Sequence, residues 1–120
     1  MKTSLLKKGR SYRKKGQLNK ALNVYNRMSM STNEKDQDIA IYMQAFTYVM
    51  LAHQVKNNLN LLGADLRSKP SDPYTQACRY LNMIKNSHFD PKQYGLPLLK
   101  SYELTEIRRH SPAKKKVTQH

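Results

Sequence analysis

The spacing of apolar residues constrains the fold of this 120-residue chain more than any other feature. In four segments, apolar side chains recur at intervals of three and four residues, which is the period of an amphipathic α-helix. No sustained alternation of apolar and polar residues predicts a β-strand. The predicted helices cover residues 18–28, 36–53, 73–84 and 96–107. We therefore expect an all-α fold, a small bundle of about four helices.

Local signals predict where these helices begin. A turn around Gly16 precedes the first helix, and Asp36 places negative charge near the start of the second, where it suits the helix dipole. Asp72 can cap the third helix, with Pro73 as its first residue. Pro97 is expected in the first turn of the fourth.

Each predicted helix has one apolar face that we expect to meet a shared core. The four faces consist of Leu18, Ala21, Leu22, Val24, Tyr25 and Met28; Ile41, Ala45, Tyr48, Val49 and Ala52; Tyr74, Ala77, Cys78, Leu81 and Ile84; and Leu98, Leu99, Tyr102 and Ile107. Aromatic residues within the helices, including Phe46 and Tyr80, are expected to pack in the core and not to stack on nucleic-acid bases.

Chain length and punctuation predict one domain, residues 1–110, followed by a basic extended tail, residues 111–120. The tail is polar and is interrupted by Pro112. Within the domain, residues 55–70 are expected to form a basic insertion between the second and third helices. Gly63 and Pro70 indicate that this insertion is irregular or a short hairpin.

Positive charge is the dominant feature of the composition. The formal net charge is +14 at pH 7, and no acidic residue precedes Glu34. Such an excess destabilises a compact chain by self-repulsion, so we expect a polyanionic partner, above all a nucleic acid. Two other interpretations of the basic residues 1–16 stay open. They could be a mitochondrial transit peptide, which is also basic and free of acids, or a solvated helix face.

Catalytic and metal-binding patterns are missing from the sequence. The single cysteine, Cys78, excludes an internal disulfide, and its place on an apolar face predicts a buried small hydrophobe. The four histidines lie too far apart for a metal site. Glu103 and Glu106 are expected to balance local charge and not to act as an acid–base pair. No apolar run approaches the roughly 18 residues that span a membrane. We expect no enzymatic activity, cofactor, metal or membrane partner.

The N-terminal region is similar to the tetratricopeptide repeat, a helical hairpin that forms peptide-binding arrays. Small and aromatic residues occupy the corresponding positions, namely Gly9, Tyr12, Gly16, Ala21, Tyr25 and Met28. Leu5 stands in place of the repeat's leading Trp, and no second copy follows. This resemblance implies a helical-hairpin adaptor that binds an acidic protein partner.

Four segments, in the same order, resemble the bacterial-type small-subunit ribosomal protein seven family, of which this chain looks like a shortened, divergent member. The matching positions are Lys14, Lys15, Gly16, Ala21 and Val24 in YRKKGQLNKALNVY; Ala45, Phe46 and Val49 in KDQDIAIYMQAFTYVML; Arg79, Tyr80 and Leu81, spaced from Pro70 as in the family; and Ala113, Lys114, Lys115, Lys116 and His120 near the end. The family's glycine-rich ribbon is shorter here, and its final segment is missing.

This second resemblance implies a structural constituent of the small ribosomal subunit. It would bind rRNA of the three-prime major domain, in the head, near the exit-site tRNA and the mRNA exit path. Its other partners would be neighbouring ribosomal proteins of the head, and the exit-site tRNA and mRNA. The shortening suits a mitochondrial (organellar) ribosome better than one in a bacterial cytoplasm.

The cations expected to contact RNA phosphates are Lys7, Lys8, Arg10, Arg13, Lys14, Lys15, Arg67, Lys69, Arg79, Lys114, Lys115 and Lys116. They crowd the loops and ends of the chain, whereas an adaptor should concentrate its cations on one concave helix face. A free RNA- or DNA-binding regulator has the same electrostatics as a ribosomal protein, so the sequence leaves that alternative open.

Overall fold

The structure is a computed structural model that describes residues 2–62 and 72–110, with side chains for residues 4–56 and 72–110. These residues form five α-helices and one short 3-10 helix, and none of them lies in a β-strand. The elements are α1 (Lys2–Lys14), α2 (Leu18–Met28), α3 (Glu34–Leu62), α4 (Pro73–Met83), η1 (Pro91–Tyr94) and α5 (Ser101–Arg109). The predicted all-α fold class is confirmed.

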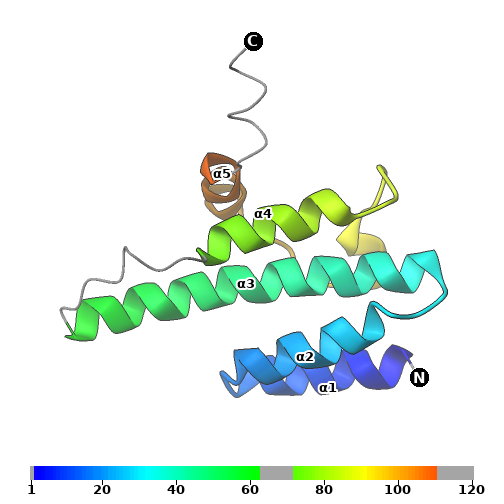
Figure 1. The fold of residues 1–120 in the computed structure, drawn as a ribbon, viewed down its shortest axis with the longest axis horizontal. Coiled ribbons are helices and arrows are strands. Elements are labelled where there is room, and N and C mark those ends of the chain that lie inside the picture. Colours follow the sequence, from blue (N-terminus) through cyan, green and yellow to red (C-terminus); the bar gives the residue numbers. More distant parts are fainter. Residues whose placement is uncertain (1, 63–71, 111–120) are drawn as a thin grey trace, which may run out of the picture.

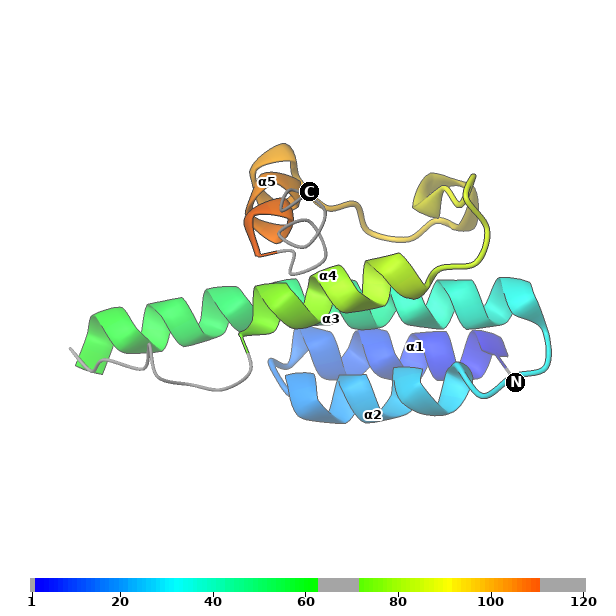
Figure 2. The same ribbon diagram turned by 45° about the horizontal axis from the view of Figure 1, so that its top comes forward.

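The long helix α3 is the axis of the molecule (Figure 1). α1 and α2 form an antiparallel hairpin on one side of α3, and α4 runs antiparallel to α3 on the other side (Figures 1 and 2). α5 packs against α4, and η1 lies near the N-terminal half of α3. Consequently α3 separates the basic N-terminal hairpin from the α4–α5 layer.

A glycine turn and two capping side chains set boundaries of the helices. Gly16 adopts φ +77° between α1 and α2, a conformation that favours glycine. The Asn33 side chain accepts a hydrogen bond from the Asp36 backbone N–H and so caps α3. Asp72 caps α4 by accepting from the Tyr74 backbone N–H at 3.2 Å, as the sequence predicted.

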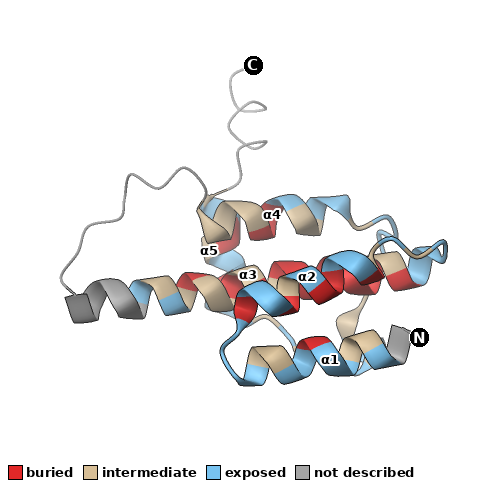
Figure 3. Cartoon of the chain, turned by 60° about the horizontal axis from the view of Figure 1, so that its bottom comes forward, coloured by how far each residue is buried: buried red, intermediate tan, exposed pale blue. Residues whose placement is uncertain are grey.

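The core consists of two clusters along α3, and Figure 3 shows buried residues concentrated there and on α2. One cluster joins α2 to α3 and contains Ala21, Tyr25, Met28, Ile39, Ala40, Tyr42 and Met43. The other joins α3, α4 and α5 and contains Ala45, Val49, Ala77, Cys78 and Ile107. Cys78 is buried, as predicted. The aromatic residues within the helices pack as expected, for example Tyr48 stacked on Tyr80 at 5.5 Å.

The irregular segment between α3 and α4 starts later than predicted. Residues 55–62, which we expected to begin an insertion, continue α3 to Leu62. Because this stretch contains neither Gly nor Pro before Gly63, nothing in it ends the helix. The remainder of the predicted insertion and the whole predicted tail, residues 63–70 and 111–120, lie outside the described residues.

Both ends of the domain also differ from the sequence prediction. Residues 2–14 form a helix that we did not predict, and its apolar positions Leu5 and Leu6 pack against the core. At the other end, α5 begins at Ser101, four residues after Pro97. The carbonyl of Pro97 accepts a hydrogen bond from the Tyr42 hydroxyl at 2.6 Å, which holds this segment extended across α3.

Several expected core residues are less buried than predicted, and those that are half-buried are Leu22, Tyr48, Tyr74, Leu81, Ile84 and Leu99. Leu98 and Tyr102, placed on an inward face by the prediction, are 49% and 55% exposed. For Leu98 the reason is the later start of α5, because this residue precedes Ser101 and is not part of the helix. Leu81 is half-buried, where it contacts both core clusters.

Candidate nucleic-acid interface

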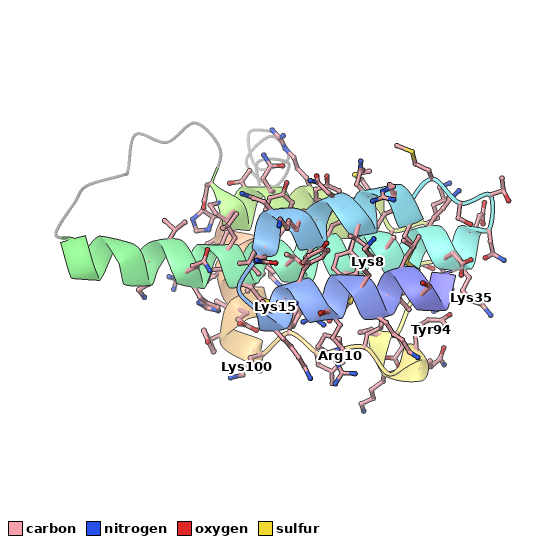
Figure 4. All side chains as sticks on the ribbon, turned by 90° about the horizontal axis from the view of Figure 1, so that it is seen from below. Lys8, Arg10, Lys15, Lys35, Tyr94 and Lys100 are labelled. Carbon is pink, nitrogen blue, oxygen red and sulfur yellow. The ribbon has the colours of Figure 1, made fainter. Side chains whose placement is uncertain are left out.

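Five cations of α1 and the turn after it form one exposed surface, called here the α1 basic face: Lys7, Lys8, Arg10, Lys14 and Lys15. All five side chains are exposed. Figure 4 looks onto this face and labels Lys8, Arg10 and Lys15 on it. The same view labels Lys35, near the start of α3, and Lys100, the residue before α5, toward the edges of the molecule. The sequence predicts that these cations contact RNA phosphates, and their exposed position agrees with that prediction. The contact itself stays a prediction.

None of these five cations forms an ion pair with a carboxylate in the described part of the chain. Two buried carboxylates, those of Asp38 and Glu103, are engaged elsewhere. Asp38 accepts from the backbone N–H groups of Lys85 and Asn86 at 2.9 and 3.0 Å, which joins the end of α4 to α3. Glu103 accepts from the Lys100 backbone N–H at 2.7 Å and contacts His53. The positive potential of the α1 basic face is therefore not neutralised within the described residues.

A groove of about 470 Å³ lies beside this face, between α1 and the segment that follows η1. Four cations line it: Lys7, Arg10, Arg13 and Lys14. No acidic residue lines it. The opposite wall is largely apolar and consists of Tyr94, Gly95, Leu96 and Pro97. We call this hollow the basic groove.

Arg13 differs from the other cations because its guanidinium is half-buried at the base of this groove. Its Nε atom donates to the Tyr25 hydroxyl at 3.1 Å, and its guanidinium carbon lies 5.3 Å from the centre of the Phe46 ring. One of its Nη atoms lies 3.9 Å from the Met50 sulfur. The orientation of Arg13 is thus fixed by three residues, the buried Tyr25 and the half-buried Phe46 and Met50. A partly desolvated charge of this kind gains free energy from an anionic partner, and no described carboxylate supplies one.

Tyr25 in turn depends on a glycine in the neighbouring helix. A Cβ atom added at Gly9 would lie 2.5 Å from the Cε1 and Cζ atoms of the Tyr25 ring. The absence of a side chain at Gly9 therefore lets α1 approach α2 closely enough for Arg13 to reach the Tyr25 hydroxyl. Burial raises the pKa of that hydroxyl above its usual value, while the hydrogen bond and charge of Arg13 act in the opposite direction.

The apolar wall is held in place by contacts with the core. The Tyr94 ring stacks on Phe89 with centroids 5.6 Å apart, and Phe89 meets the Tyr42 ring in a tilted arrangement, also at 5.6 Å. Gly95 adopts φ +66° and ends η1. The Tyr42–Pro97 hydrogen bond fixes the far end of the wall, and burial raises the pKa of Tyr42 to about 12.

The opposite side of α3 carries a mixed charge distribution. Nε2 of His53 lies 2.8 Å from the Glu103 carboxylate, and Nε2 of His110 lies 2.9 Å from that of Asp72. A second hollow there is lined by Lys56, Glu106 and Arg109 among others.

Within the described residues, no group of three or more His, Cys, Asp and Glu side chains could hold a metal ion. None of the described helices is long and apolar enough to cross a membrane.

The predicted phosphate-binding residues therefore divide into three sets. Lys7, Lys8, Arg10, Arg13, Lys14 and Lys15 lie together around α1. Arg79 is exposed on α4, which lies on the other side of α3. Arg79 is therefore not part of the surface that the cations around α1 form. Arg67, Lys69 and Lys114 to Lys116 lie outside the described residues.

Sequence reasoning missed the apolar wall of the groove. One signal was available for the wall. In DPKQYG, Asp90 and Pro91 begin a short turn that Gly95 ends, and Asp90 accepts from the Lys92 backbone N–H. Nothing in the sequence indicates that this turn lies beside α1, because that contact depends on packing against α3.

Comparisons with models of known protein families, with curated proteins and with solved structures find no match for this chain.

Proposed function

We propose that this protein is a structural constituent of a small ribosomal subunit that binds rRNA through the α1 basic face. The observation that carries the RNA-binding part is the set of five exposed cations on and next to α1 without carboxylate partners in the described residues. Folded RNA presents closely spaced phosphates, and phosphate contacts fix the register of a protein on a helix.

The ribosomal part of the proposal rests on the four ordered segments that resemble the small-subunit ribosomal protein seven family. By that resemblance, the site of binding is the three-prime major domain in the head, beside neighbouring head proteins and near the exit-site tRNA and mRNA. The proposed location is an organellar, mitochondrial ribosome. The chemistry needed is binding and not turnover, so we propose no catalytic role and no cofactor.

The arrangement of charge also bears on the adaptor alternative. An adaptor of the tetratricopeptide type would bind an acidic segment on the concave face of stacked hairpins. Here α1 and α2 form one hairpin, and its cations lie on the exposed α1 basic face and along the basic groove beside the segment that follows η1, and not between two stacked hairpins. This placement favours an extended polyanion such as RNA over a peptide held between hairpins.

Sedimentation of tagged, full-length protein from its own cells tests the proposal. The wild type should sediment with the small subunit and should move to the top of the gradient after ribonuclease treatment. The triple variant Lys7→Ala, Arg10→Ala, Lys14→Ala should be largely released at moderate salt. A charge control, Lys56→Ala with Arg108→Ala, removes exposed cations elsewhere and should still sediment.

Two results would contradict the proposal. Sedimentation with a ribonuclease-resistant protein complex would favour the adaptor. Binding to RNA that never enters the subunit fraction would favour a free regulator, and the ribosomal part would then be wrong while RNA binding stands.

A further inference from the structure

The basic groove has two walls of different chemistry, and this division points to a ligand with two different parts. One wall carries the cations Lys7, Arg10 and Lys14, and Arg13 lies at its base. The other presents the ring of Tyr94 with Leu96 and Pro97. A ligand that fits both walls combines a negative charge with a flat, apolar body. A nucleotide has this combination, because its phosphate is anionic and its base has two π-faces.

We infer that the basic groove receives one unpaired nucleotide that projects from a bound RNA. This inference rests on the proposed function and specifies which feature of the RNA is recognised. The base would lie against Tyr94 and the apolar wall, and the flanking phosphates would contact the cations of α1.

The size of the groove agrees with such an occupant. Its volume of about 470 Å³ falls within the range of roughly 300–1,000 Å³ that is usual for sites of small ligands. Lys7 and Lys14 are seven residues apart, about 10 Å along the helix axis. That distance lets the row of cations follow the backbone on both sides of one nucleotide. A paired base, by contrast, stays in its helix and cannot reach the apolar wall.

Arg13 is the residue that distinguishes this groove from a general basic surface. Its guanidinium is held by Tyr25, Phe46 and Met50, so it does not have to be ordered when the ligand binds. The fork of an arginine can also bridge two oxygens of one phosphate. A preoriented arginine costs less entropy per contact than a free surface lysine.

Tyr94 is similarly preoriented, because its ring stacks on Phe89. Protein recognition of unpaired RNA bases commonly uses stacking on aromatic side chains, and this contact tolerates any base. The groove therefore selects for an unpaired nucleotide and not for a sequence.

Two short RNA hairpins provide the test, identical except for one additional unpaired 2-aminopurine in the stem of the second. The full-length wild type should bind the bulged hairpin at least about fivefold more tightly, the lower end of what one stacked base contributes. Binding should also change the 2-aminopurine fluorescence, because the base leaves the RNA stack. Tyr94→Leu should abolish the preference and the fluorescence change while it keeps the affinity for the unbulged hairpin.

The matched control is Tyr102→Leu, which removes an exposed tyrosine outside the groove and should behave as wild type. If Tyr94→Leu does not fold, the wild-type preference and fluorescence still decide the question. Equal binding of both hairpins without a fluorescence change would overturn the inference and leave RNA binding intact. Failure to bind either hairpin would overturn the proposed function itself. An acidic peptide that displaces the bulged RNA in a Tyr94-dependent way would show that the groove takes peptides.

Discussion

The Nε atom of Arg13 donates a hydrogen bond to the Tyr25 hydroxyl over 3.1 Å, and this bond connects the basic groove to the protein core. Tyr25 is fully buried, whereas the guanidinium of Arg13 also lines the groove. Arg13 therefore contributes to folding and, by our proposal, to RNA binding.

Arg13→Met should destabilise the protein, because it leaves the buried Tyr25 hydroxyl without its hydrogen-bond partner. Loss of a partner for a buried polar group costs about 1–3 kcal/mol. In the double variant Arg13→Met, Tyr25→Phe, no hydroxyl is left unsatisfied. The decrease in its free energy of unfolding should therefore be smaller than the sum of the decreases in the two single variants. Urea unfolding of all four proteins measures this coupling. Additive losses would show that the hydrogen bond does not form in solution.

Gly9→Ala should also destabilise the fold, although alanine is the better helix former by about 1 kcal/mol. The added methyl group would overlap the Tyr25 ring at 2.5 Å, and overpacking of this kind typically costs about 1–3 kcal/mol. Ser11→Ala in the same helix is the control, because Ser11 is exposed and the change should be neutral or stabilising. A thermal unfolding midpoint for Gly9→Ala equal to or above that of wild type would contradict the close packing of α1 on α2.

Stability should fall steeply at alkaline pH because Tyr42 is buried in its neutral form. Burial raises its pKa in the folded protein to about 12, whereas an unfolded tyrosine has a pKa of about 10. The contribution of the buried, neutral Tyr42 to the free energy of unfolding is complete below pH 10. It is lost as pH rises from about 10 to 12, because the unfolded chain releases the tyrosine proton first. A shift of this size corresponds to about 2–3 kcal/mol.

Tyr42→Phe lacks this titration, so its free energy of unfolding should decline less steeply than that of wild type between pH 10 and 12. At neutral pH the variant should be the less stable protein, since the Pro97 carbonyl loses its donor. The control is Tyr102→Phe, an exposed position, which should follow the wild-type curve. Parallel curves for wild type and Tyr42→Phe would show that Tyr42 is not buried as described.

The mature protein should retain α1. Leu5, Leu6 and Tyr12 pack against the core, and Gly9 contacts Tyr25, so removal of residues 1–16 would expose apolar surface on α2 and α3. Intact-mass measurement of native protein should therefore give a chain that includes Gly9. A mature N-terminus near Gly16 would mean that these residues are a transit peptide, the alternative that the sequence left open.

Most helices could be predicted because their signals are local. The apolar face of residues 18–28, the cap at Asp72 and the buried position of Cys78 each follow from residues a few positions apart. The end of α3 was placed too early because the irregular segment marked by Gly63 and Pro70 was extended back to residue 55. Asparagine is only a weak helix former, and the strong stop in that stretch is Gly63.

The groove could not be predicted, because it depends on contacts between distant segments. Arg13 and Tyr25 are twelve residues apart, and Tyr42 and Pro97 are fifty-five apart. The helix of residues 2–14 was not among the four predicted helices, because its apolar residues Leu5, Leu6 and Tyr12 are few among many cations. The clustering of cations near the N-terminus is visible in the sequence, because no acidic residue precedes Glu34, and their contact with RNA stays a prediction.

The measurement that tests RNA binding by the α1 basic face most directly is the salt dependence of affinity for small-subunit rRNA. If the protein neutralises about 6–8 phosphates, the logarithm of the association constant should fall with the logarithm of salt concentration with a slope near −5. Lys14→Ala with Lys15→Ala should flatten the slope by about 1–2 units without a loss of stability, since both side chains are exposed. The charge-matched control, Lys56→Ala with Arg108→Ala, should keep the wild-type slope. A wild-type slope near zero, or equal slopes for the two double variants, would contradict the account.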